Sequence, residues 1–203
     1  MPRLVLGSRN KKKLRELVEL LSDLVDVTDL TPFANAPADI DETGTTFEEN
    51  ARIKATTLAP LLNEWVIGED SGLVVPALNG DPGVYSARYA GTHGDDAANN
   101  AKLLAAMATF TGEKRAGYYV STIALADPTG KVVAVVDGRC WGVIGTQPRG
   151  DGGFGYDPLF IIPEYHASFG ELTSTVKHAL SHRGRAVSKL RPLIRSHILA
   201  ATP

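Results

Sequence analysis

Residues 66–75 read Val-Ile-Gly-Glu-Asp-Ser-Gly-Leu-Val-Val, and this stretch decides both the expected fold and the expected chemistry. Two adjacent acids, Glu69 and Asp70, lie where two apolar, strand-like runs meet. Carboxylates carried by core-forming segments have to be paired, hydrogen-bonded or bound to a metal ion. Hard cations such as Mg²⁺ take oxygen ligands of this kind, often together with substrate phosphates. A polar turn between strands at 65–69 and 72–77 explains the segment alone equally well.

The N-terminus combines a short apolar run with a basic segment, Gly-Ser-Arg-Asn-Lys-Lys-Lys-Leu-Arg at 7–15. The pattern predicts a strand over 3–7 and an amphipathic helix over 10–22, capped by Ser8 or Asn10. Lysines at a helix N-terminus oppose the helix dipole, and a bound polyanion would offset that cost. A solvated basic first turn is the alternative. The candidate phosphate-binding residues here are Ser8, Arg9, Asn10, Lys11, Lys12 and Lys13.

Two further motifs lie in the last third of the chain. The glycine-rich segment 150–158 carries the aromatic residues Phe154 and Tyr156, whose faces suit base stacking, worth about 1–3 kcal/mol per base. His182 and Arg183 follow Ser181, which can cap a helix. Each motif taken alone is equally consistent with an ordinary loop or a surface pair.

Composition is ordinary for a globular protein, with 203 residues, 43% hydrophobic and 22% charged. We expect one domain over 1–203. A net charge of −2 indicates no general affinity for nucleic acid or membrane. No apolar run reaches the roughly 20 residues of a membrane helix, and no signal peptide is recognisable, so a cytoplasmic location is expected. The single cysteine, Cys140, fits a reducing compartment and a packing role.

The distribution of charge is uneven along the chain. Residues 1–15 hold six Lys or Arg and no acid, and six more follow Glu171 without an acid. All 23 acids lie between these two segments. Basic ends and an acidic middle suit a site that binds both a polyphosphate and a metal ion, and they equally suit ends that fold against the middle.

The remaining segments alternate between strand-like and helix-like patterns. Thr46 and Glu49 form a capping box that opens a helix, on which Asn50 and Lys54 share a face. An Asp-Pro-Thr-Gly turn predicts a long antiparallel hairpin. The segments are a strand at 25–29, helices at 46–62 and 95–107, hairpin strands at 116–126 and 131–144, and helices at 170–178 and 182–198, the last bent by Pro192. The fold class is therefore α/β with a mixed β-sheet and flanking helices.

Six short motifs occur in order from about residue 4 to about residue 195. They are Ser8–Lys13, Thr46–Ala51 with Lys54-Ala55, Asp70–Leu73, Pro82–Arg88, Phe154–Pro158 and Ser181–Gly184. Together they resemble the inosine/xanthosine triphosphate pyrophosphatase family, which removes non-canonical purine nucleotides from the nucleotide pool. The chain departs from the family pattern in two places. Glu69 stands where an aspartate is common, and Asp41 stands where a metal-binding glutamate is usual.

The resemblance implies two lobes around a central nucleotide-binding cleft, a homodimer, and Mg²⁺-dependent hydrolysis of ITP, dITP or XTP to the monophosphate and pyrophosphate. It also implies that Phe154 stacks on the base, within the motif that contains Gly155 and Tyr156. Asp157, His182 and Arg183 would read the edge of the base.

We expect Asp70 to act as general base and metal ligand. The further candidates for metal or water contacts are Glu69, Asp41 and Glu42. The lysines expected to hold phosphates are Lys13, Lys54 and Lys177, with hydrogen bonds from Ser8, Asn10 and Ser71.

Two other classes of protein stay open. A nucleotide-binding regulator without turnover could use the same basic ends and aromatic loop, but a pure phosphate binder gains nothing from the carboxylates unless it binds metal. A single-strand nucleic-acid binder could use Tyr118, Tyr119, Phe154 and Tyr156 as a stacking platform. An aromatic content of 7% and the acidic middle of the chain argue against it.

Overall fold

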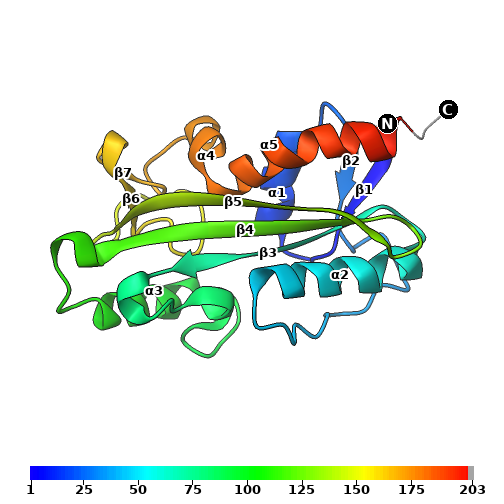
Figure 1. The fold of residues 1–203 in the computed structure, drawn as a ribbon. Helices are drawn as coiled ribbons and strands as arrows, with labels where there is room; N and C mark the ends of the chain where they lie inside the picture. The colour runs from blue at the N-terminus through cyan, green and yellow to red at the C-terminus, as the bar shows by residue number, and fades with distance from the viewer. Residues whose placement is uncertain (201–203) are drawn as a thin grey trace. The chain divides into compact units, whose positions relative to one another are not determined.

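A computed structural model describes residues 1–200 as an α/β protein (Figure 1). Over these residues, seven strands form one sheet in the order β2-β1-β3-β4-β5-β6-β7. β1 is parallel to β2 and β3, whereas β6 is antiparallel to β5 and β7, so the predicted mixed sheet is confirmed. The strands are β1 Arg3–Leu6, β2 Asp26–Thr28, β3 Val66–Val74, β4 Ala116–Ala126, β5 Val132–Ile144, β6 Phe160–Ile162 and β7 Ala167–Ser168.

Five α-helices accompany the sheet in the described part of the chain. They are α1 Lys11–Leu21, α2 Phe47–Leu62, α3 Asp96–Ala106, α4 Ser174–Leu180 and α5 His182–Ile194, which a π-helical turn, Arg195–Leu199, extends. Asn10 caps α1, and Thr46 and Glu49 form the predicted capping box of α2. No described helix has the length and apolar character that crossing a membrane requires.

The chain divides into two compact units, which are described separately. Unit 1 comprises residues 1–70, 121–138 and the chain from Arg183 onward, and unit 2 comprises 71–120 and 139–182. β3, β4 and β5 contribute residues to both units. Each unit has its own apolar core. The predicted central cleft stays a prediction.

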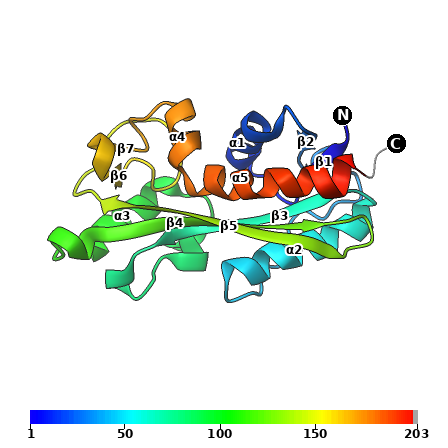
Figure 2. The same cartoon turned by 45° about the horizontal axis from the view of Figure 1, so that its top comes forward.

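In unit 1, the alternation of side chains along the strands produces a core on each face of the sheet. Leu4 and Leu6 pack in one core with residues of α1 and α5, whereas Val5 packs in the other with α2. Figures 1 and 2 show α1 and α5 on one side of β1 and α2 on the other. α2 approaches β3 closely at Gly68, where an added Cβ would lie 2.0 Å from the carbonyl oxygen of Ala51. Glycine at this position therefore lets α2 lie directly against the strand that carries Glu69 and Asp70.

The sequence prediction of a break at the paired acids was wrong. β3 runs through Glu69 and Asp70 as one nine-residue strand, Val66–Val74. Both carboxylates are buried, 0% and 6% exposed, and both have polar partners. The strand can therefore pass through the core without a turn, because its charges are paired there rather than hydrated. Two short strands, β6 and β7, were not predicted, since three and two residues give no period-two signal.

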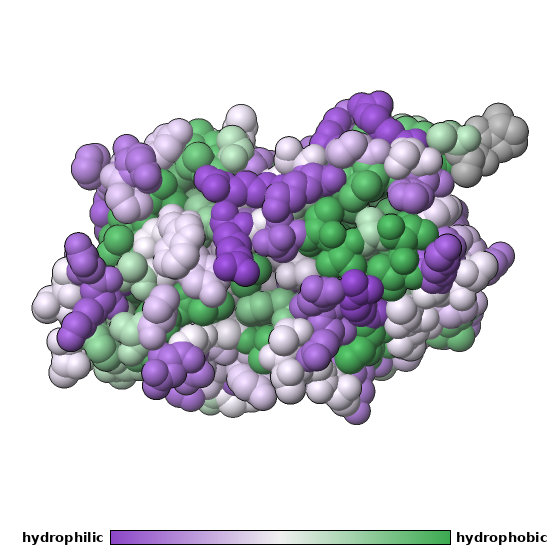
Figure 3. Space-filling view, viewed as in Figure 1, coloured by the Kyte–Doolittle hydropathy of each residue, from purple (hydrophilic) through white to green (hydrophobic). Residues whose placement is uncertain are grey.

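The first half of β5 is an apolar sheet edge in unit 1. Its five residues Val132–Val136 are all half-buried, and β5 pairs with β6 at its other end, through Val143 and Ile144. Figure 3 shows apolar side chains gathered over this part of β5, between α5 and α2. Lys189 of α5 donates to the carbonyl oxygen of Asp137, 2.6 Å away, so a charged side chain blocks one end of the edge. Charged residues at sheet edges oppose pairing with other chains.

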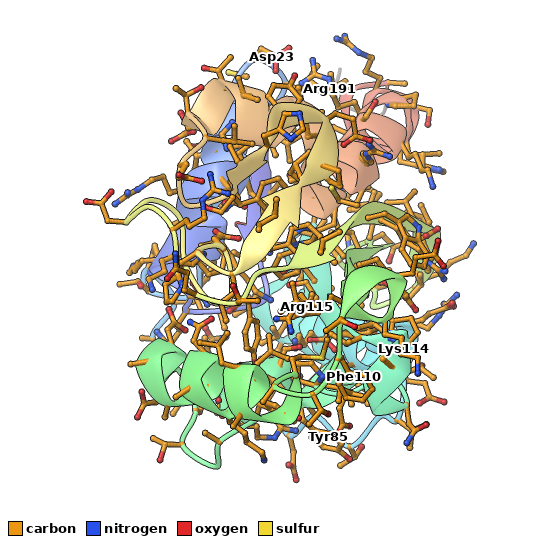
Figure 4. The ribbon with its side chains drawn as sticks, turned by 90° about the vertical axis from the view of Figure 1, so that its left-hand side faces the viewer. Asp23, Tyr85, Phe110, Lys114, Arg115 and Arg191 are labelled. Carbon is orange, nitrogen blue, oxygen red and sulfur yellow. The ribbon has the colours of Figure 1, made fainter. Side chains whose placement is uncertain are left out.

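In unit 2, the buried guanidinium of Arg115 joins several loop ends. It donates to the carbonyl oxygens of Met107 at 2.8 Å, Phe110 at 3.1 Å, Ile144 at 2.6 Å and Gly145 at 2.5 Å. Arg115 and Phe110 lie next to each other in Figure 4. The ends of α3, β4 and β5 therefore meet at one planar donor group, whose fork geometry a lysine cannot reproduce.

We predict that Arg115→Met lowers the free energy of unfolding by about 2–4 kcal/mol, because buried carbonyl groups lose charged donors. The measurement is urea unfolding of the purified variant. The matched control is Lys114→Ala, the exposed neighbour, which should stay within about 0.5 kcal/mol of the parent. Equal stability of Arg115→Met and the control would show that the hydrogen bonds of Arg115 do not stabilise unit 2.

Candidate functional site

The first group of predicted site residues surrounds the buried carboxylate of Glu69 in unit 1. Its Oε2 lies 2.7 Å from the Nζ of Lys13, and its Oε1 accepts from the Nη2 of Arg183 at 3.0 Å. The hydroxyl of Ser121 donates to the same Oε1 at 2.8 Å. Glu69 is therefore held by two cations and a hydroxyl that come from α1, α5 and β4.

The charge of Glu69 is fixed by these partners. Burial alone would raise the pKa of Glu69, but the charges of Arg183 and Lys13 more than offset it and hold that pKa well below the usual range. Arg183 is 1% exposed and also pairs with Glu16 of α1. Its own pKa is raised, because these two carboxylates outweigh the effect of burial. The guanidinium thus has two carboxylate partners in unit 1, and the sequence analysis foresaw neither of them.

Asp70 has a different environment from its neighbour Glu69. Its Oδ2 accepts from the side-chain amide of Asn50 at 3.2 Å, and its Oδ1 lies 3.3 Å from the Nζ of Lys54. Burial raises the pKa of Asp70, and the nearby charge of Glu42 adds to this, while Lys54 partly opposes it. A carboxylate with a raised pKa is a stronger proton acceptor than an ordinary aspartate.

Lys54 of α2 bridges two carboxylates. Its Nζ lies 2.9 Å from Glu42 and 3.3 Å from Asp70, and it donates to the carbonyl oxygen of Glu69 at 3.2 Å. Burial would lower the pKa of Lys54, but the charges of Asp70 and Glu42 raise it, so the lysine stays cationic. One ammonium group therefore stands between two acids that belong to the predicted metal set.

These acids fit a hard divalent cation by their donor chemistry, because Glu42 and Asp70 present carboxylate oxygens to the same positive charge. Asp41 is exposed on the loop, unlike its neighbour Glu42. Within residues 1–200, no cluster of three or more metal-binding side chains is already assembled. A metal ion here would rest on Asp70 and Glu42, together with water or substrate oxygens.

The basic N-terminal segment has mostly local partners. The amides of Lys12 and Lys13 donate to the side chain of Asn10, and the amide of Asn10 donates to Ser8. The side chain of Lys11 pairs with Asp29 at 2.6 Å. Arg9 donates to the carbonyl oxygens of Ala36 and Pro37. Lys12 is exposed. Lys13 connects the basic segment to β3, through its ion pair with Glu69.

The second group of predicted residues lies in unit 2, around Asp157. Its Oδ2 accepts from the amide of Phe154 at 2.7 Å and from the Nζ of Lys177 at 2.7 Å. The same Nζ lies 4.9 Å from the ring centroid of Phe154. Lys177, which was predicted to hold phosphate, therefore lies with the residues predicted to bind the base. An ammonium group against a ring face is a favourable cation–π arrangement.

Two more aromatic residues of unit 2 support this group from within the core. Tyr119 stacks on the imidazole of His182, with ring centroids 4.6 Å apart and planes at 13°. Burial raises the pKa of Tyr119 well above its usual value, and the charge of Asp157 adds to this, so the phenol stays neutral. Tyr156 is 3% exposed and donates its hydroxyl to the carbonyl oxygen of Ser86 at 2.8 Å. Tyr156 thus fixes its loop to the core. Ser71, which was predicted to bind phosphate, is half-buried on β3.

Sequence reasoning missed Glu16, Ser121 and Tyr119. Glu16 is 8% exposed although helix periodicity places it away from the face of Leu17 and Leu21, so nothing in the sequence signalled its burial. Ser121 and Tyr119 lie in an apolar strand and give no signal either.

These two groups of side chains have the chemistry expected of a nucleotide-binding protein. Unit 1 holds lysines and acids that suit a polyphosphate with a metal ion, and unit 2 holds an aromatic ring with a cation and an imidazole that suit a base. The model of the Ham1 family matches residues 4–193, and the chain belongs to this family.

Known proteins resemble the chain over nearly its whole length. A dITP/XTP pyrophosphatase of Rhodopirellula baltica is 52% identical over 190 residues, which cover 93% of this chain and 91% of the relative. The solved structure of a HAM1 protein from Coxiella burnetii has a TM-score of 0.86 at 39% identity, covering 97% of this chain and all (100%) of the other. The crystal structure of a nucleoside-triphosphatase, dITP/XTP pyrophosphatase, from Mycobacterium abscessus has a TM-score of 0.75 at 44% identity, covering 94% and 99%.

We predict that Glu69→Gln destabilises the protein by about 3–5 kcal/mol at neutral pH, because Arg183 and Lys13 lose a buried counter-charge. The folded pKa of Glu69 lies below its unfolded value, so its stabilisation is present above the unfolded pKa. That stabilisation is lost as the pH falls toward the folded pKa. The gap between parent and variant should therefore shrink in acid, measured by urea unfolding across a pH series.

The control for this variant is Glu64→Gln, which removes an exposed ion pair with Arg3 in the same unit. Surface pairs contribute about 0–1 kcal/mol, so this change should have a small effect. A constant gap between Glu69→Gln and the parent at every pH would contradict the buried-anion assignment.

Proposed function

We propose that this protein hydrolyses non-canonical purine nucleoside triphosphates, such as dITP, ITP and XTP, to the monophosphate and pyrophosphate. The observation that carries the proposal is the buried Asp70 with its raised pKa, held by Asn50 and Lys54 beside Glu42. The similarity to relatives named dITP/XTP pyrophosphatases supports the choice of substrate. Water attacks the α-phosphorus, and pyrophosphate leaves.

Asp70 takes a proton from the attacking water. Lys54 partly opposes the rise that burial causes in the pKa of Asp70, and Asn50 orients the carboxylate by donating to Oδ2. The roles of base and metal ligand compete on a single carboxylate, and its two oxygens allow one to face a cation while the other accepts the proton.

Asp70 and Glu42 would hold a magnesium ion through carboxylate oxygens, by the donor chemistry of these two residues. Such an ion, when bound, polarises phosphate oxygens and offsets the charge that develops on the leaving group. Glu69 and Asp41 were the other predicted metal candidates. We assign Glu69 to charge pairing with Arg183, and the exposed Asp41 to no contact with the ion.

Lys13 and Lys54 are the phosphate-binding lysines of the proposal. Both ammonium groups are already paired with acids in unit 1, so an incoming polyanion meets cations held in place rather than mobile side chains. Fixed cations directed at developing charge lower the barrier without reorganisation during the reaction.

Unit 2 supplies the groups for the base. Phe154 offers a stacking face, and Lys177 and His182 offer the donors for the edge of the base. Hypoxanthine and xanthine carry an acceptor oxygen at C6, where adenine carries a donor amine. A donor fixed by burial, such as Lys177 at 5% exposure, favours the oxygen and rejects the amine. The proposal leaves Arg183 out of this set, because Arg183 belongs to unit 1, where its guanidinium is paired with Glu16 and Glu69.

A nucleotide-binding regulator without turnover is the second candidate, since the same lysines and aromatic loop would serve it. The buried carboxylate of Asp70 favours the enzyme, because a pure phosphate binder gains nothing from a buried acid unless it binds metal. The proposal also includes a cytoplasmic location and a homodimer.

The experiment that tests the proposed hydrolysis is incubation of the protein with dITP, XTP, dGTP or dATP and Mg²⁺, with pyrophosphate and orthophosphate measured separately. Pyrophosphate from dITP and XTP supports the proposal, and no turnover would favour the regulator.

We predict that Asp70→Asn lowers kcat by about 10²–10⁴-fold with dITP, the range for a lost acid–base group, while the fold is retained. Asparagine keeps the shape of the side chain, so circular dichroism and unfolding should confirm an intact protein. Asp26→Asn, at an exposed position of β2 in the same unit, is the control and should keep full activity. Turnover within threefold of the parent would remove Asp70 from the role of base.

We predict that Phe154→Ala lowers kcat/KM for dITP and for dATP alike, by about 10–100-fold, because every base has a stackable face. The ratio of the two values should therefore change little. The matched control is Tyr165→Ala, an exposed aromatic residue of unit 2 at 48% exposure, which should leave both values unchanged. A large change in the ratio would mean that Phe154 selects the base rather than stacks on it.

A further inference from the structure

The loop that carries Phe154 is tied to α3 by two side chains that the proposed mechanism does not use. The amide of Gly155 donates to the Oδ2 of Asp96 at 3.0 Å. The carbonyl oxygen of Gly155 accepts from the Nδ2 of Asn100 at 2.8 Å. Asp96 and Asn100 are four residues apart and so lie on one face of α3. Both polar backbone groups of a single glycine are thus held by one helix, and all of these residues belong to unit 2.

The contact of Asn100 with Gly155 leaves the other polar atom of its side-chain amide unsatisfied. Its Nδ2 donates to Gly155 and also to the carbonyl oxygen of Asp96 at 2.8 Å, so both amide hydrogens are used. Its Oδ1 is buried and has no hydrogen-bond partner among the residues that the structure describes. Buried acceptors without a partner are uncommon and costly, which indicates that the position of the Nδ2 group matters. Asparagine is also a weaker helix former than most residues that could occupy this turn.

Gly155 is the residue at which this loop needs an external restraint. It adopts a φ of 61°, in the left-handed region that glycine enters freely. On its two sides, the amide of Phe154 is held by Asp157 and the hydroxyl of Tyr156 by Ser86. Without a restraint on Gly155, the backbone between these points could rotate and carry the ring of Phe154 with it.

We infer that Asp96 and Asn100 are positioning residues that clamp Gly155 and so hold the ring of Phe154 in its base-binding position before the nucleotide arrives. The inference rests on the proposed function, since it takes Phe154 to be the stacking residue. A loop ordered in advance loses less conformational freedom on binding, so the clamp acts on affinity. It does not act on the chemical step, which belongs to Asp70.

The test compares Asn100→Asp with the parent on dITP. Aspartate has nearly the same shape but no amide hydrogens, so the bonds to the carbonyl oxygens of Gly155 and Asp96 are lost and a carboxylate faces these oxygens instead. Alanine removes the same two bonds without adding a charge. We expect KM to rise about tenfold, the equivalent of one hydrogen bond, with kcat within twofold. Asn100→Ala should show the same split. Lys102→Ala is the control, because it removes a bond from the same helix to the carbonyl oxygen of Tyr89 at 2.6 Å, and its KM should not change.

A double-mutant cycle separates positioning from a general structural role. If Asn100 acts through Phe154, then Asn100→Asp adds no further rise in KM when Phe154 is already alanine. Full additivity of the two changes would overturn the inference. So would a fall in kcat that equals the loss in kcat/KM.

Amide hydrogen exchange at Gly155, measured by NMR without nucleotide, tests the clamp independently of activity. The expected result is faster exchange at Gly155 in Asp96→Ala, the variant that removes the acceptor of this amide, with the exchange of β4 amides unchanged. Unchanged exchange at Gly155 would overturn the clamp. If Phe154→Ala alone leaves KM unaltered, the stacking part of the proposed function fails, and the exchange result still decides whether the loop is clamped.

Discussion

The pairing of the buried carboxylate of Glu69 is the interaction on which unit 1 depends. A fully buried anion in the middle of a core strand is tolerated only with fixed counter-charges, and here Arg183 and Lys13 provide them. Because these two cations come from α5 and α1, the pairing fixes both helices against β3. The same constraint explains why Arg183 is one of the largest fully buried side chains of the protein.

Two neighbouring acids on β3 thereby acquire opposite properties. Cations hold the pKa of Glu69 well below its usual range, whereas burial raises the pKa of Asp70. Pairs of carboxylates whose environments separate their pKa values in this way commonly divide into a permanent anion and a proton acceptor. In the proposed mechanism, Glu69 is therefore the anion that organises the surrounding cations, and Asp70 is the group that exchanges a proton.

In unit 2, the aromatic ring of Phe154 is carried by a glycine-rich loop, whose backbone has to be held in place. Short contacts to the loop do this. Asp157 accepts a hydrogen bond from the amide of Phe154, and the hydroxyl of Tyr156 donates to the carbonyl oxygen of Ser86. The carboxylate of Asp157 also lies against Gly153, where an added Cβ would be 2.1 Å from its Oδ2. Lys177 pairs with this carboxylate and lies over the ring of Phe154, so one lysine contacts both the group that holds the loop and the ring proposed to stack on the base.

Local signals in the sequence predicted much of this arrangement. The capping box at Thr46 and the periodicity of α2 placed Asn50 and Lys54 on one face, where they meet Asp70. Contacts between distant segments could not be predicted in the same way. Arg183 lies 114 residues from Glu69 and 167 from Glu16, and no periodicity connects them. The continuous strand through Glu69 was missed for the same reason, because its partners are remote in sequence.

Hydrolysis of dITP in water enriched in ¹⁸O tests the central claim most directly. The account predicts pyrophosphate and deoxyinosine monophosphate as products, with the heavy oxygen in the monophosphate, because water attacks the α-phosphorus. Mass spectrometry of the two products gives the position of the label. Heavy oxygen in the pyrophosphate would place the attack at the β-phosphorus, and release of orthophosphate as the first product would place it at the γ-phosphorus. Either result would contradict the reaction proposed for Asp70 and the groups around it.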